Sequence, residues 1–443
     1  MSTKHLDKIV SLCKRKGFVF PNSEIYGGLK ASYDYGPLGV ELKKAISEKW
    51  WKAMTNNSNI VGLDSSIMVH PDVWEASGHI ANFNDPMTDN KDTKKRYRID
   101  DLLSKQKSKV IDDLCETLSI ENENDSHTLD KISHTLLQES DKYSNALESA
   151  EVIDPFSGNI GKWTQATQFN LMFQTNSGPS EKSGKSIYLR PETAQGIYIN
   201  YLLVQNSMRL KVPFGIAQIG KAFRNEIIAR NFIFRTREFE QMEMQYFVHP
   251  SEDESSMNLW KEKRISFYFE ELGISEDNLK FHQHSEDALA HYAKDAFDIE
   301  YNFPFGWGEV EGIHNRIDFD LKEHEKLSGK NMMYFDALKN EKYHPFIIET
   351  STGLNRLFLM VLCESYYEDN ENNRTVLKLP FDLAPNKIVI CPLLKKDGLP
   401  EKAKEVYDSI NSTHKCVYDQ QGSIGKRYYR QDEAGTPFGI TID

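Results

Sequence analysis

The chain has 443 residues, of which 39% are hydrophobic, and carries a formal net charge of −12. This length predicts two or three domains, and the hydrophobic content is sufficient for a large core, which excludes an intrinsically disordered protein. The acidic excess argues against a general nucleic-acid-binding surface, because phosphate contacts favour positive charge. The basic stretches Lys91–Arg98 and Lys426–Arg430 are local exceptions.

Several features of the sequence predict a reduced, cytoplasmic protein. No apolar run approaches the ~20 residues that a membrane-spanning helix needs, and the N-terminal residues lack the apolar core of a signal peptide. The five cysteines lie far apart without a Cys-x-x-Cys pair, so neither disulfides nor a zinc site is expected. We therefore expect no membrane partner.

The first half of the chain combines a helix, a strand and a helical insertion. An amphipathic helix is predicted after Pro37, and the apolar stretch 59–71 that follows is typical of an edge strand. Residues 100–149 are charged, rich in Ser and Asn, and contain neither Gly nor Pro. This composition predicts a small, mostly helical insertion on the outside of the main domain.

The second half of the chain is predicted to contain two sheets of different types, one antiparallel and one parallel. Residues 158–350 are rich in strand-like runs with helices between them, which predicts a large antiparallel sheet in an α+β domain. After a helix over 354–364, the tail alternates strand (387–391), helix (401–410), strand (415–418), helix (424–433) and strand (438–442). Such alternation predicts a small parallel sheet built from βαβ units.

Polar residues recur at every second position in two predicted neighbouring strands. One strand places Gln218, Gly220, Ala222, Arg224 and Glu226 on one face, and the returning strand does the same with the odd-numbered residues from Arg237 to Gln245. The opposite face of the return strand carries methionines and a tyrosine. A sheet with one wetted face would show this pattern, but a ligand cradle explains it better, because buried charges need partners.

The residue types on this face favour ATP as the ligand. Arginine suits bidentate phosphate contacts and can stack on an aromatic plane. A phenylalanine on the same face, Phe239, offers a surface for a purine ring, and a nearby glutamate can accept a hydrogen bond from an exocyclic amine. A sugar or a lipid would match these groups less well.

Six ordered blocks resemble the class II aminoacyl-tRNA synthetases in their glycyl form. The polar strand pair is similar to motif 2, LRPETAQGIYINY resembles a block typical of glycyl-tRNA synthetases, and IIETSTGLNRL resembles motif 3. The tail SIGKRYYRQDEAGTPFGITID resembles the anticodon-binding domain of this family. The six blocks are Tyr33–Lys43 and Val73–His79 (around motif 1), Leu189–Tyr201, Arg224–Glu243, Gly306–Leu321 and Ile347–Leu357.

The resemblance implies a domain plan and a reaction. Residues 1–83 would form the N-terminal part of the catalytic domain with motif 1, residues 84–160 the helical insertion, residues 161–376 the catalytic core with motifs 2 and 3, and residues 384–443 an α/β anticodon-binding domain. The implied activity is ATP-dependent attachment of glycine to tRNA(Gly) through a glycyl-adenylate. The implied assembly is a homodimer built on the helix 38–50 and the strand that runs to Pro71.

The resemblance also implies roles for individual residues. Arg224 would hold the α-phosphate and act with Arg356 as a catalytic residue, and Glu226 would contact the adenine amine. Phe239 would stack below adenine, with Arg356 above it. The implied ATP-binding residues are Arg224, Asn225, Glu226, Phe234, Arg235, Thr236, Arg237, Glu238, Phe239, Glu309, Val310, Gly353, Leu354, Asn355 and Arg356. The implied substrate-binding residues are Arg98, Glu192, Phe239, Glu240, Gln241, Met242, Glu243, Glu349, Thr350, Ser351, Thr352 and Gly353.

The chemistry of glycine agrees with the implied substrate residues. Glycine has no side chain to grip, so a protein must recognise its ammonium group, and carboxylates such as Glu192, Glu243 and Glu349 suit that task. No nucleophilic side chain is required, because the glycine carboxylate itself attacks the α-phosphate. Mg²⁺ is expected to accompany ATP, through Glu309 or Glu349.

Two of the departures from the family pattern bear on ligands. Relatives often carry Cys-x-x-Cys pairs that align with Asn90/Thr93 and Asp154/Ser157, and because all four cysteines are absent here, no zinc is expected. The motif 2 loop reads IIAR over 227–230 where relatives usually have Ser-Pro before Arg, so its contacts with the tRNA acceptor end are not carried over.

Two alternative functions and one hypothesis about the tail follow from the same residues. A class II synthetase for another amino acid is one alternative, and a non-catalytic, nucleic-acid-binding relative is the other; retention of Arg224 and Arg356 argues against the latter. On the predicted helix 424–433, Lys426, Arg427 and Arg430 are expected to grip the tRNA anticodon arm.

Overall fold

The computed structural model describes residues 3–122, 126–178, 185–227, 231–285, 289 and 293–443. These residues form two compact units. The first unit contains residues 3–69, 192–284 and 293–443, and the second is built from residues 70–191.

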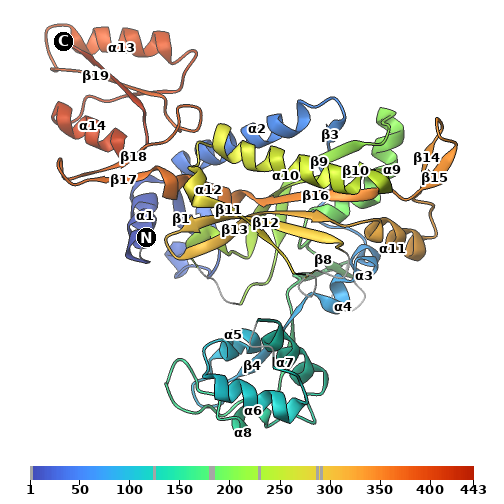
Figure 1. Cartoon of the computed structure of the whole chain (residues 1–443). Coiled ribbons are helices and arrows are strands. Elements are labelled where there is room, and N and C mark those ends of the chain that lie inside the picture. Colours follow the sequence, from blue (N-terminus) through green and yellow to red (C-terminus); the bar gives the residue numbers. More distant parts are fainter. Residues whose placement is uncertain (1–2, 123–125, 179–184, 228–230, 286–288, 290–292) are drawn as a thin grey trace. The chain divides into compact units, whose positions relative to one another are not determined.

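A seven-stranded sheet organises the first unit (Figure 1). All neighbouring strands are antiparallel except the edge strand β3, which runs parallel to β9. The predicted antiparallel sheet is therefore confirmed. Across the sheet the strands are β11 (Leu279–Gln283), β12 (Asp295–Phe303), β13 (Gly306–Asn315), β16 (Phe346–Gly353), β10 (Glu238–Val248), β9 (Phe214–Phe223) and β3 (Ile60–Gly62).

One face of this sheet carries the main hydrophobic core. Four helices bury their apolar sides against it, and Met242 and Met244 of β10 point into this core, as their alternation predicts. Figure 1 shows α2 and α10 lying along this side of the sheet. The four helices are α1 (Thr3–Lys16), α2 (Pro37–Thr55), α10 (Asp253–Glu270) and α12 (Leu354–Ser365).

The opposite face of the sheet is only partly covered. Two helices, α9 (Ala194–Met208) and α11 (Phe319–Ser328), pack there against Phe214, Phe247 and Ile347 at one end of the strands. The polar residues of β10, β13 and β16 occupy the rest of this face. Two short hairpins complete the main part of the unit, β1 (Val19–Pro21) with β2 (Tyr33–Tyr35), and β14 (Tyr334–Asp336) with β15 (Glu341–Tyr343).

Two strand predictions need correction. Strand β9 ends at Phe223, so Arg224 and Glu226 lie just beyond the sheet and are positioned by loop contacts instead. The stretch 59–71 contains only the three-residue strand β3, and Pro71 begins helix α3 rather than ending a strand. Proline suits the first turn of a helix as well as a strand edge, so the sequence did not distinguish the two.

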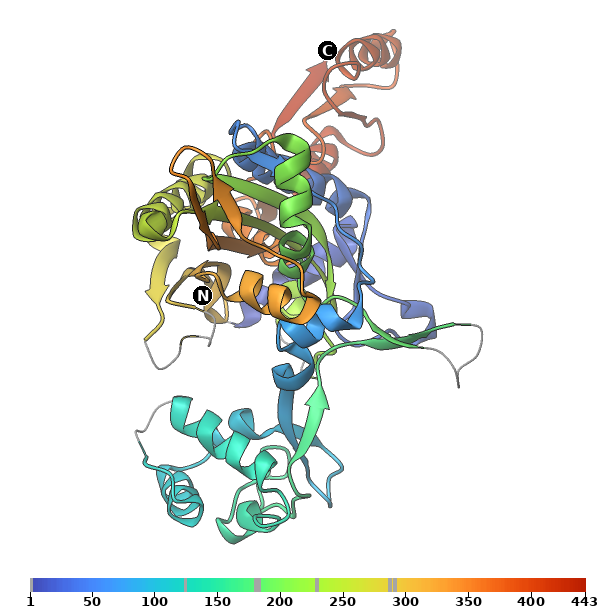
Figure 2. The same ribbon diagram turned by 90° about the vertical axis from the view of Figure 1, so that its right-hand side faces the viewer.

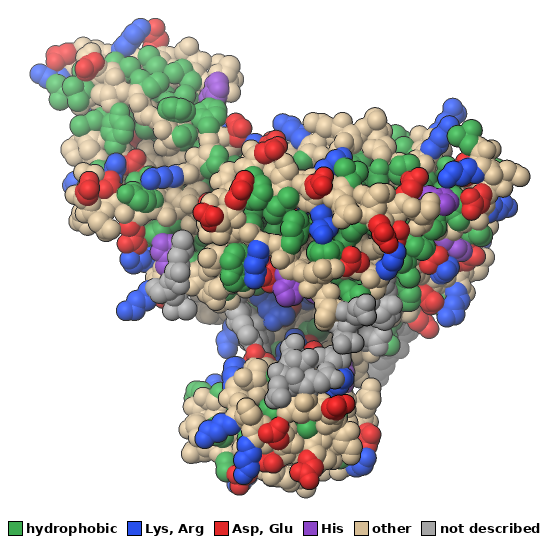
Figure 3. Space-filling model, in the orientation of Figure 1, with side chains coloured by type: hydrophobic (Ala, Val, Ile, Leu, Met, Phe, Trp, Pro, Cys, Tyr) green, Lys and Arg blue, Asp and Glu red, His purple; other side chains and the backbone are tan. Residues whose placement is uncertain are grey.

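The C-terminal module, residues 387–443, has the predicted strand–helix alternation. Its parallel sheet has the order β20 (Cys416–Tyr418), β19 (Ile388–Pro392), β21 (Phe438–Ile442), and carries α13 (Leu399–Ile410) and α14 (Ile424–Asp432). A hairpin of β17 (Tyr366–Asp369) and β18 (Arg374–Leu377) precedes it. Figure 3 shows hydrophobic side chains gathered on this module, among whose exposed apolar residues are Leu393, Leu394, Tyr429 and Phe438.

One basic residue of α14 is not on the surface. Arg427 is 3% exposed, and its guanidinium donates hydrogen bonds to the carbonyl oxygens of Gly422 and Pro392. Arg430 instead pairs with Asp419. The hypothesis that Arg427 forms part of an RNA-binding face is therefore wrong. Successive residues of a helix are rotated by about 100°, so Arg427 points inward although Lys426 lies on the surface.

The second unit has its own core, around Ile99, Leu114, Leu147 and Trp163. Figure 2 shows helices α5 to α8 gathered beside a short antiparallel sheet. The sheet has the order β5 (Arg96–Arg98), β4 (Asn84–Asp89), β6 (Thr167–Asn170), and β7 (Gln174–Ser177) pairs with β8 (Lys185–Tyr188). The helices are α3 (Pro71–Ala76), α4 (His79–Asn82), α5 (Ile99–Leu103), α6 (Ser108–Leu118), α7 (Ser126–Gln138) and α8 (Ala146–Ser149).

None of the helices in the described part of the chain has both the length and the apolar character that crossing a bilayer requires.

Candidate active site

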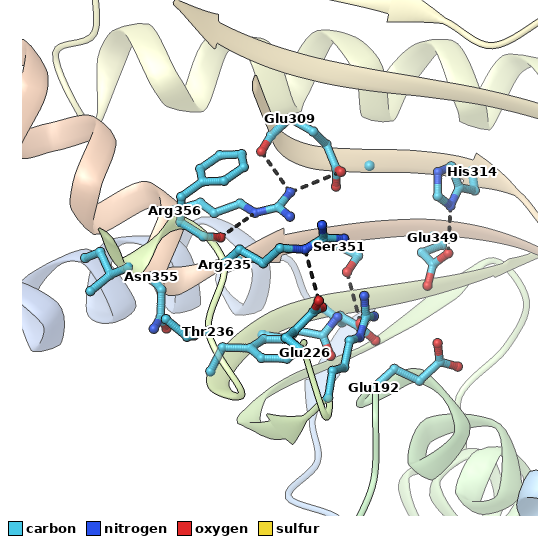
Figure 4. A pocket seen from close by; sticks show the side chains of 18 of the residues that line it. Glu192, Glu226, Arg235, Thr236, Glu309, His314, Glu349, Ser351, Asn355 and Arg356 are labelled. Carbon is cyan, nitrogen blue, oxygen red and sulfur yellow. Dashed lines mark hydrogen bonds and ion pairs between the residues drawn. The ribbon is translucent and has the colours of Figure 1, made fainter. Parts of the chain in front are cut away.

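A polar pocket opens on the uncovered face of the first unit's sheet (Figure 4). Strands β10, β13 and β16 form its floor, and the start of α12 and the segment after β9 form its sides. Most of the residues expected to bind ATP or the amino acid meet here. The lining residues are Glu192, Arg224, Glu226, Ile233, Phe234, Arg235, Thr236, Phe239, Gln241, Glu243, Glu309, Gly312, His314, Arg316, Glu349, Ser351, Gly353, Asn355 and Arg356.

Strand register explains why distant residues meet in this pocket. Glu243 lies opposite Ser351, which in turn lies opposite Gly312. Two residues further along the same pair of strands, Glu349 lies opposite His314 and faces the same side of the sheet. Directly opposed residues have Cβ atoms about 5 Å apart, so pairing three strands is enough to assemble side chains that are more than a hundred positions apart in the sequence.

The segment after β9 folds back on the return strand. The backbone N–H of Arg224 donates to the carbonyl of Arg237 at 2.9 Å, and the Arg237 Nε donates to the carbonyl of Glu226 at 3.0 Å. The Glu226 carboxylate pairs with Arg235 at 3.1 Å. These contacts hold the Arg224 guanidinium 5.4 Å from the Phe239 ring centroid, so this side of the pocket presents a cation beside an aromatic face.

Arg356 occupies another side of the pocket, in the first turn of α12. Its Nη1 atom donates to the carbonyl oxygen of Glu309 at 2.9 Å and pairs with the carboxylate of the same residue at 3.0 Å (Figure 4). Its guanidinium carbon lies 4.4 Å from the Phe234 ring centroid. The positive charge of Arg356 lowers the pKa of Glu309, so this carboxylate is ionised at neutral pH.

Three glutamates occupy the inner end of the pocket, and two of them are held in different states. Burial raises the pKa of Glu243 to about 8, and the nearby Glu349 and Glu192 add to this effect. Burial alone would raise the pKa of Glu349 as well, but Arg316 and His314 outweigh it and lower that pKa to about 2. Two buried carboxyl groups in one pocket therefore differ because only Glu349 has adjacent cationic partners.

Hydrogen bonds account for this difference. Glu349 receives bonds from Gln245 at 3.0 Å, Arg316 at 3.1 Å and His314 at 3.1 Å. The Oε1 atom of Glu243 accepts a bond from the Ser351 hydroxyl at 2.9 Å, and the hydroxyls of Ser351 and Thr193 lower the pKa of Glu243 less than burial raises it. The Oε2 atom of Glu243 is buried and accepts no hydrogen bond from the described part of the chain. A buried acceptor without a partner is costly, and it marks the position where a donor on a ligand would bind.

Several residues that orient the glutamates were not expected from the sequence. Arg316 also makes a bidentate pair with Asp320 at 2.9 and 3.0 Å, and the Tyr198 hydroxyl donates to Gln245 at 2.8 Å. A Cβ atom on Gly312 would lie 3.1 Å from the His314 ring, so glycine keeps this part of the floor open. Gly312, His314 and Arg316 all lie in the block 306–321, but a bulge in β13 obscures which residues of this block face the pocket.

A bulge in β13 changes which of its residues point toward the pocket. Glu300 pairs with Glu309 while Ile299 pairs with Glu311, which leaves Val310 as the extra residue. Simple alternation from Glu309 would place Glu311 in the pocket. Instead Glu311 is fully buried on the core side, and Gly312 and His314 face the pocket.

Other expected site residues have their side chains outside the pocket. Val310, Met242 and Leu354 are buried in the main core. Glu240 pairs with Lys43, and Glu238 with Lys221. Thr352 donates to the carbonyl of Val310, and Thr350 is fully buried. Arg98 belongs to the second unit, where it pairs with Asp85 and Asp100. Their expected roles in substrate binding are not tested by these positions.

Metal ligands are sparse in the described residues. Nowhere in residues 3–122, 126–178, 185–227, 231–285, 289 and 293–443 are three His, Cys, Asp or Glu side chains grouped as a metal site would require. Glu349 already receives three hydrogen bonds, and Glu309 at the pocket rim pairs with Arg356.

Comparisons with known proteins agree with this geometry. Residues 173–366 match the tRNA synthetase class II core domain (G, H, P, S and T), and residues 387–443 match an anticodon binding domain. A glycine--tRNA ligase from Treponema denticola is 49% identical over 99% of this chain and 89% of its own length. The chain belongs to the glycine--tRNA ligase family. A second member, from Chlorobaculum tepidum, is 50% identical over 99% of this chain and 92% of its own length.

Solved structures support the class II fold of this glycine--tRNA ligase family member. A Giardia lamblia prolyl-tRNA synthetase in complex with prolyl-adenylate has a TM-score of 0.63, with 15% identity, over 99% of this chain and 69% of that chain. At that identity the likeness concerns the fold alone. The fold class, family and synthetase activity expected from the sequence are therefore confirmed, while the roles of individual residues stay predictions.

Proposed function

We propose that the protein activates glycine with ATP and transfers the glycyl group to tRNA(Gly). The observation that carries this proposal is the inner end of the pocket, where the unpartnered oxygen of Glu243 lies among two further glutamates. The pocket also contains Arg224 and Arg356, which suit a nucleotide.

We expect glycine to be recognised by Glu243, beside which the described part of the pocket places no positive charge of its own. The Glu243 carboxyl is destabilised as an anion by burial and by its acidic neighbours. An ammonium group placed against its free Oε2 atom would supply both the missing donor and the missing positive charge. Glu192 would offer a second carboxylate, and Ser351 would fix the orientation of Glu243. Larger amino acids would have to place a side chain against the floor near Gly312 and His314.

ATP would bind between the two arginines. Phe239 and Phe234 offer aromatic faces for adenine, each with an arginine beside it. Glu226, fixed by Arg235, is placed to accept from the adenine amine. Arg224 would contact the α-phosphate, where negative charge develops during attack, and a contact that strengthens in the transition state accelerates the reaction.

Mg²⁺ would enter with ATP and neutralise charge on its phosphates. Mg²⁺ is usually held by one or two carboxylates plus substrate phosphates rather than by a full protein cage. Glu309 fits this requirement, because its carboxylate, although paired with Arg356, is ionised and half-exposed at the rim of the pocket, whereas Glu349 is buried and held by Arg316 and His314.

The two steps then need no nucleophilic side chain. A glycine carboxylate oxygen bonds to the α-phosphorus as the bond to the bridging oxygen breaks, and pyrophosphate leaves. A ribose hydroxyl at the 3′ end of the tRNA next attacks the glycyl carbonyl, and AMP leaves. The protein contributes orientation, through the rigid strands β10, β13 and β16, and positive charge at the phosphates.

The decisive experiment is ATP–pyrophosphate exchange with each candidate amino acid, followed by charging of bulk tRNA. Exchange should require glycine and should be absent with alanine or serine. Exchange with a different amino acid would identify another class II synthetase. No exchange with any amino acid would favour the non-catalytic alternative, which no observation here supports.

We also propose that the protein is a cytoplasmic homodimer. The apolar face of α2, including Leu42, Ile46 and Trp50, is buried in the protein's own core and is not available to a partner. An interface in this region would use exposed residues of the same N-terminal segment, such as Ile25 and Tyr26. A monomer in light scattering at micromolar concentration would contradict this assembly.

A further inference from the structure

Two of the pocket glutamates come from different elements of the first unit. Glu192 precedes the start of α9, whereas Glu349 lies on the central strand β16, and both side chains reach the inner end of the pocket (Figure 4). Buried polar side chains connect the two carboxylates. We call them the buried network, and its members are Gln195, Asp320, Arg316 and His324.

Gln195 is the centre of the buried network. It lies in the first turn of α9, and its Nε2 atom donates to Glu192 Oε1 at 3.1 Å and to Asp320 Oδ1 at 3.0 Å. Asp320 also accepts two bonds from Arg316, and Arg316 Nη1 donates to Glu349 at 3.1 Å. A continuous path of hydrogen bonds therefore runs from Glu192 to Glu349.

His324 determines which way the Gln195 amide points. Its Nε2 atom lies 2.8 Å from Gln195 Oε1. Burial lowers the pKa of His324 more than the nearby Asp320 and Glu323 raise it, so the ring is neutral at pH 7. An amide oxygen only accepts hydrogen bonds, so the ring must carry its proton on Nε2. The amide nitrogen then directs both of its N–H groups to carboxylates, which a reversed amide could not do.

Helix geometry explains why these groups meet. Asp320 and His324 are four residues apart in α11, so they lie on the same face of that helix. Helices α9 and α11 pack together in one apolar cluster that includes Ile197 and Leu321. Two packed helices therefore place the partners of Gln195, and the buried network has a rigid base.

We propose that Gln195 is a positioning residue for the amino group of the substrate. It holds Glu192 directly and, through the buried network, ties it to Glu349. Carboxylates that share a pocket repel each other, so a ligand that had to bring them together would lose part of its binding free energy. A pair that is already fixed avoids this loss. The inference rests on the proposed function, which supplies the ammonium group that the two carboxylates receive.

The first test measures glycine-dependent ATP–pyrophosphate exchange in the full-length protein. Q195M keeps a side chain of similar size but removes both donors, so kcat/KM for glycine should fall ~10- to 100-fold, mainly through a higher KM for glycine. The KM for ATP should stay within about twofold, because Arg224 and Arg356 are untouched. A residue needed only for folding would not separate the two KM values.

A pair of variants at His324 tests the same idea without changing Gln195. H324M removes the donor that orients the amide and should raise the KM for glycine about fivefold. H324Q provides an amide N–H in place of the imidazole N–H and should keep this KM within about twofold of the unaltered protein. In Q195M/H324M the second substitution should add little, because the amide that His324 orients is already absent.

The matched control is Q205M, a change of the same residue type in the same helix. Gln205 lies near the C-terminal end of α9, where its Nε2 atom donates to the carbonyl of Leu210 at 2.7 Å. The KM for glycine in Q205M should stay within about twofold of that of the unaltered protein. Circular dichroism establishes that each variant is folded.

The outcomes are distinct. An unchanged KM for glycine in folded Q195M would overturn the inference, and so would an equal rise of the KM values for glycine and ATP. Additive effects of Q195M and H324M would also overturn it. If Q195M does not fold, the two His324 variants decide, because equal KM values for glycine in H324M and H324Q would overturn the inference. Failure of the proposed function would instead appear as absent exchange in the unaltered protein.

Discussion

Glycine binding should depend on pH through one carboxyl group, Glu243. Its pKa of about 8 in the empty pocket means that it carries a proton at neutral pH, and the glycine ammonium must displace that proton to form an ion pair. Binding therefore strengthens as pH rises toward 8, because the group is already ionised there, and it levels off above that value. An acid with an ordinary pKa would give no pH dependence in this range.

The size of the effect follows from the ionised fraction. With a pKa of about 8, about 3% of Glu243 is ionised at pH 6.5 and half at pH 8. The apparent Kd equals the intrinsic Kd divided by this fraction, so it should fall about 15-fold over that interval. Replacing Glu243 with Gln removes one partner of a buried charge pair, which costs about 2–5 kcal/mol and raises the glycine Kd by about 30-fold or more at pH 8.

Isothermal titration calorimetry of glycine from pH 6.5 to 8 tests this reasoning. Burial lowers the pKa of His314, but its bond to Glu349 outweighs this and raises the pKa above its usual value. His314 can therefore add its own pH dependence, and the unaltered protein alone does not isolate Glu243. E243Q keeps His314 and should lose most of the slope. E309Q, in the same pocket, should keep it, since Arg356 lowers the pKa of Glu309. A pH-independent Kd in the unaltered protein, or the same slope in E243Q, would refute the assignment.

Three further variants test other parts of the structure. R224A should lower glycine-dependent exchange by about 100- to 1,000-fold with an unchanged circular dichroism spectrum, because it removes a contact to the reacting phosphate; near-normal exchange would exclude that role. R427A should lower the thermal midpoint of unfolding, since it leaves the buried carbonyl of Pro392 without this donor, whereas the neighbouring K426A should not. R264M should destabilise the protein by about 3–5 kcal/mol in urea unfolding, because it leaves the buried Glu311 without its bidentate partner; R264M/E311M should recover much of that loss.

The sequence predicted the floor of the pocket well because strand periodicity is strict. Along β10 the side chains alternate without interruption, so Gln241 and Glu243 face the pocket while Met242 and Met244 enter the core. Cross-strand pairing then follows from the antiparallel sheet. The C-terminal module was equally readable, since each of its strands and helices is short and clearly separated.

No facing was predicted for the residues of β13, where one extra residue changes the facing of those that follow. The extra residue Val310 in β13 reverses the alternation, so Glu311 goes to the core and His314 to the pocket. Nothing in the local composition marks a bulge that lacks glycine. On α14, a cluster of basic residues was treated as one surface, although the helical turn between Lys426 and Arg427 separates their directions.

The states of the glutamates lie beyond any local pattern. Glu243 and Glu349 are the same residue type on adjacent strands, yet one is held neutral and the other ionised. The cause is Arg316, which lies past the end of β13 and reaches Glu349 because Asp320 fixes the other edge of its guanidinium. A pocket with every carboxylate matched by an internal cation would have no charge to offer a substrate. By matching Glu349 and leaving the Oε2 atom of Glu243 without a partner, the fold keeps a buried carboxyl oxygen in the pocket that an incoming ammonium group can satisfy.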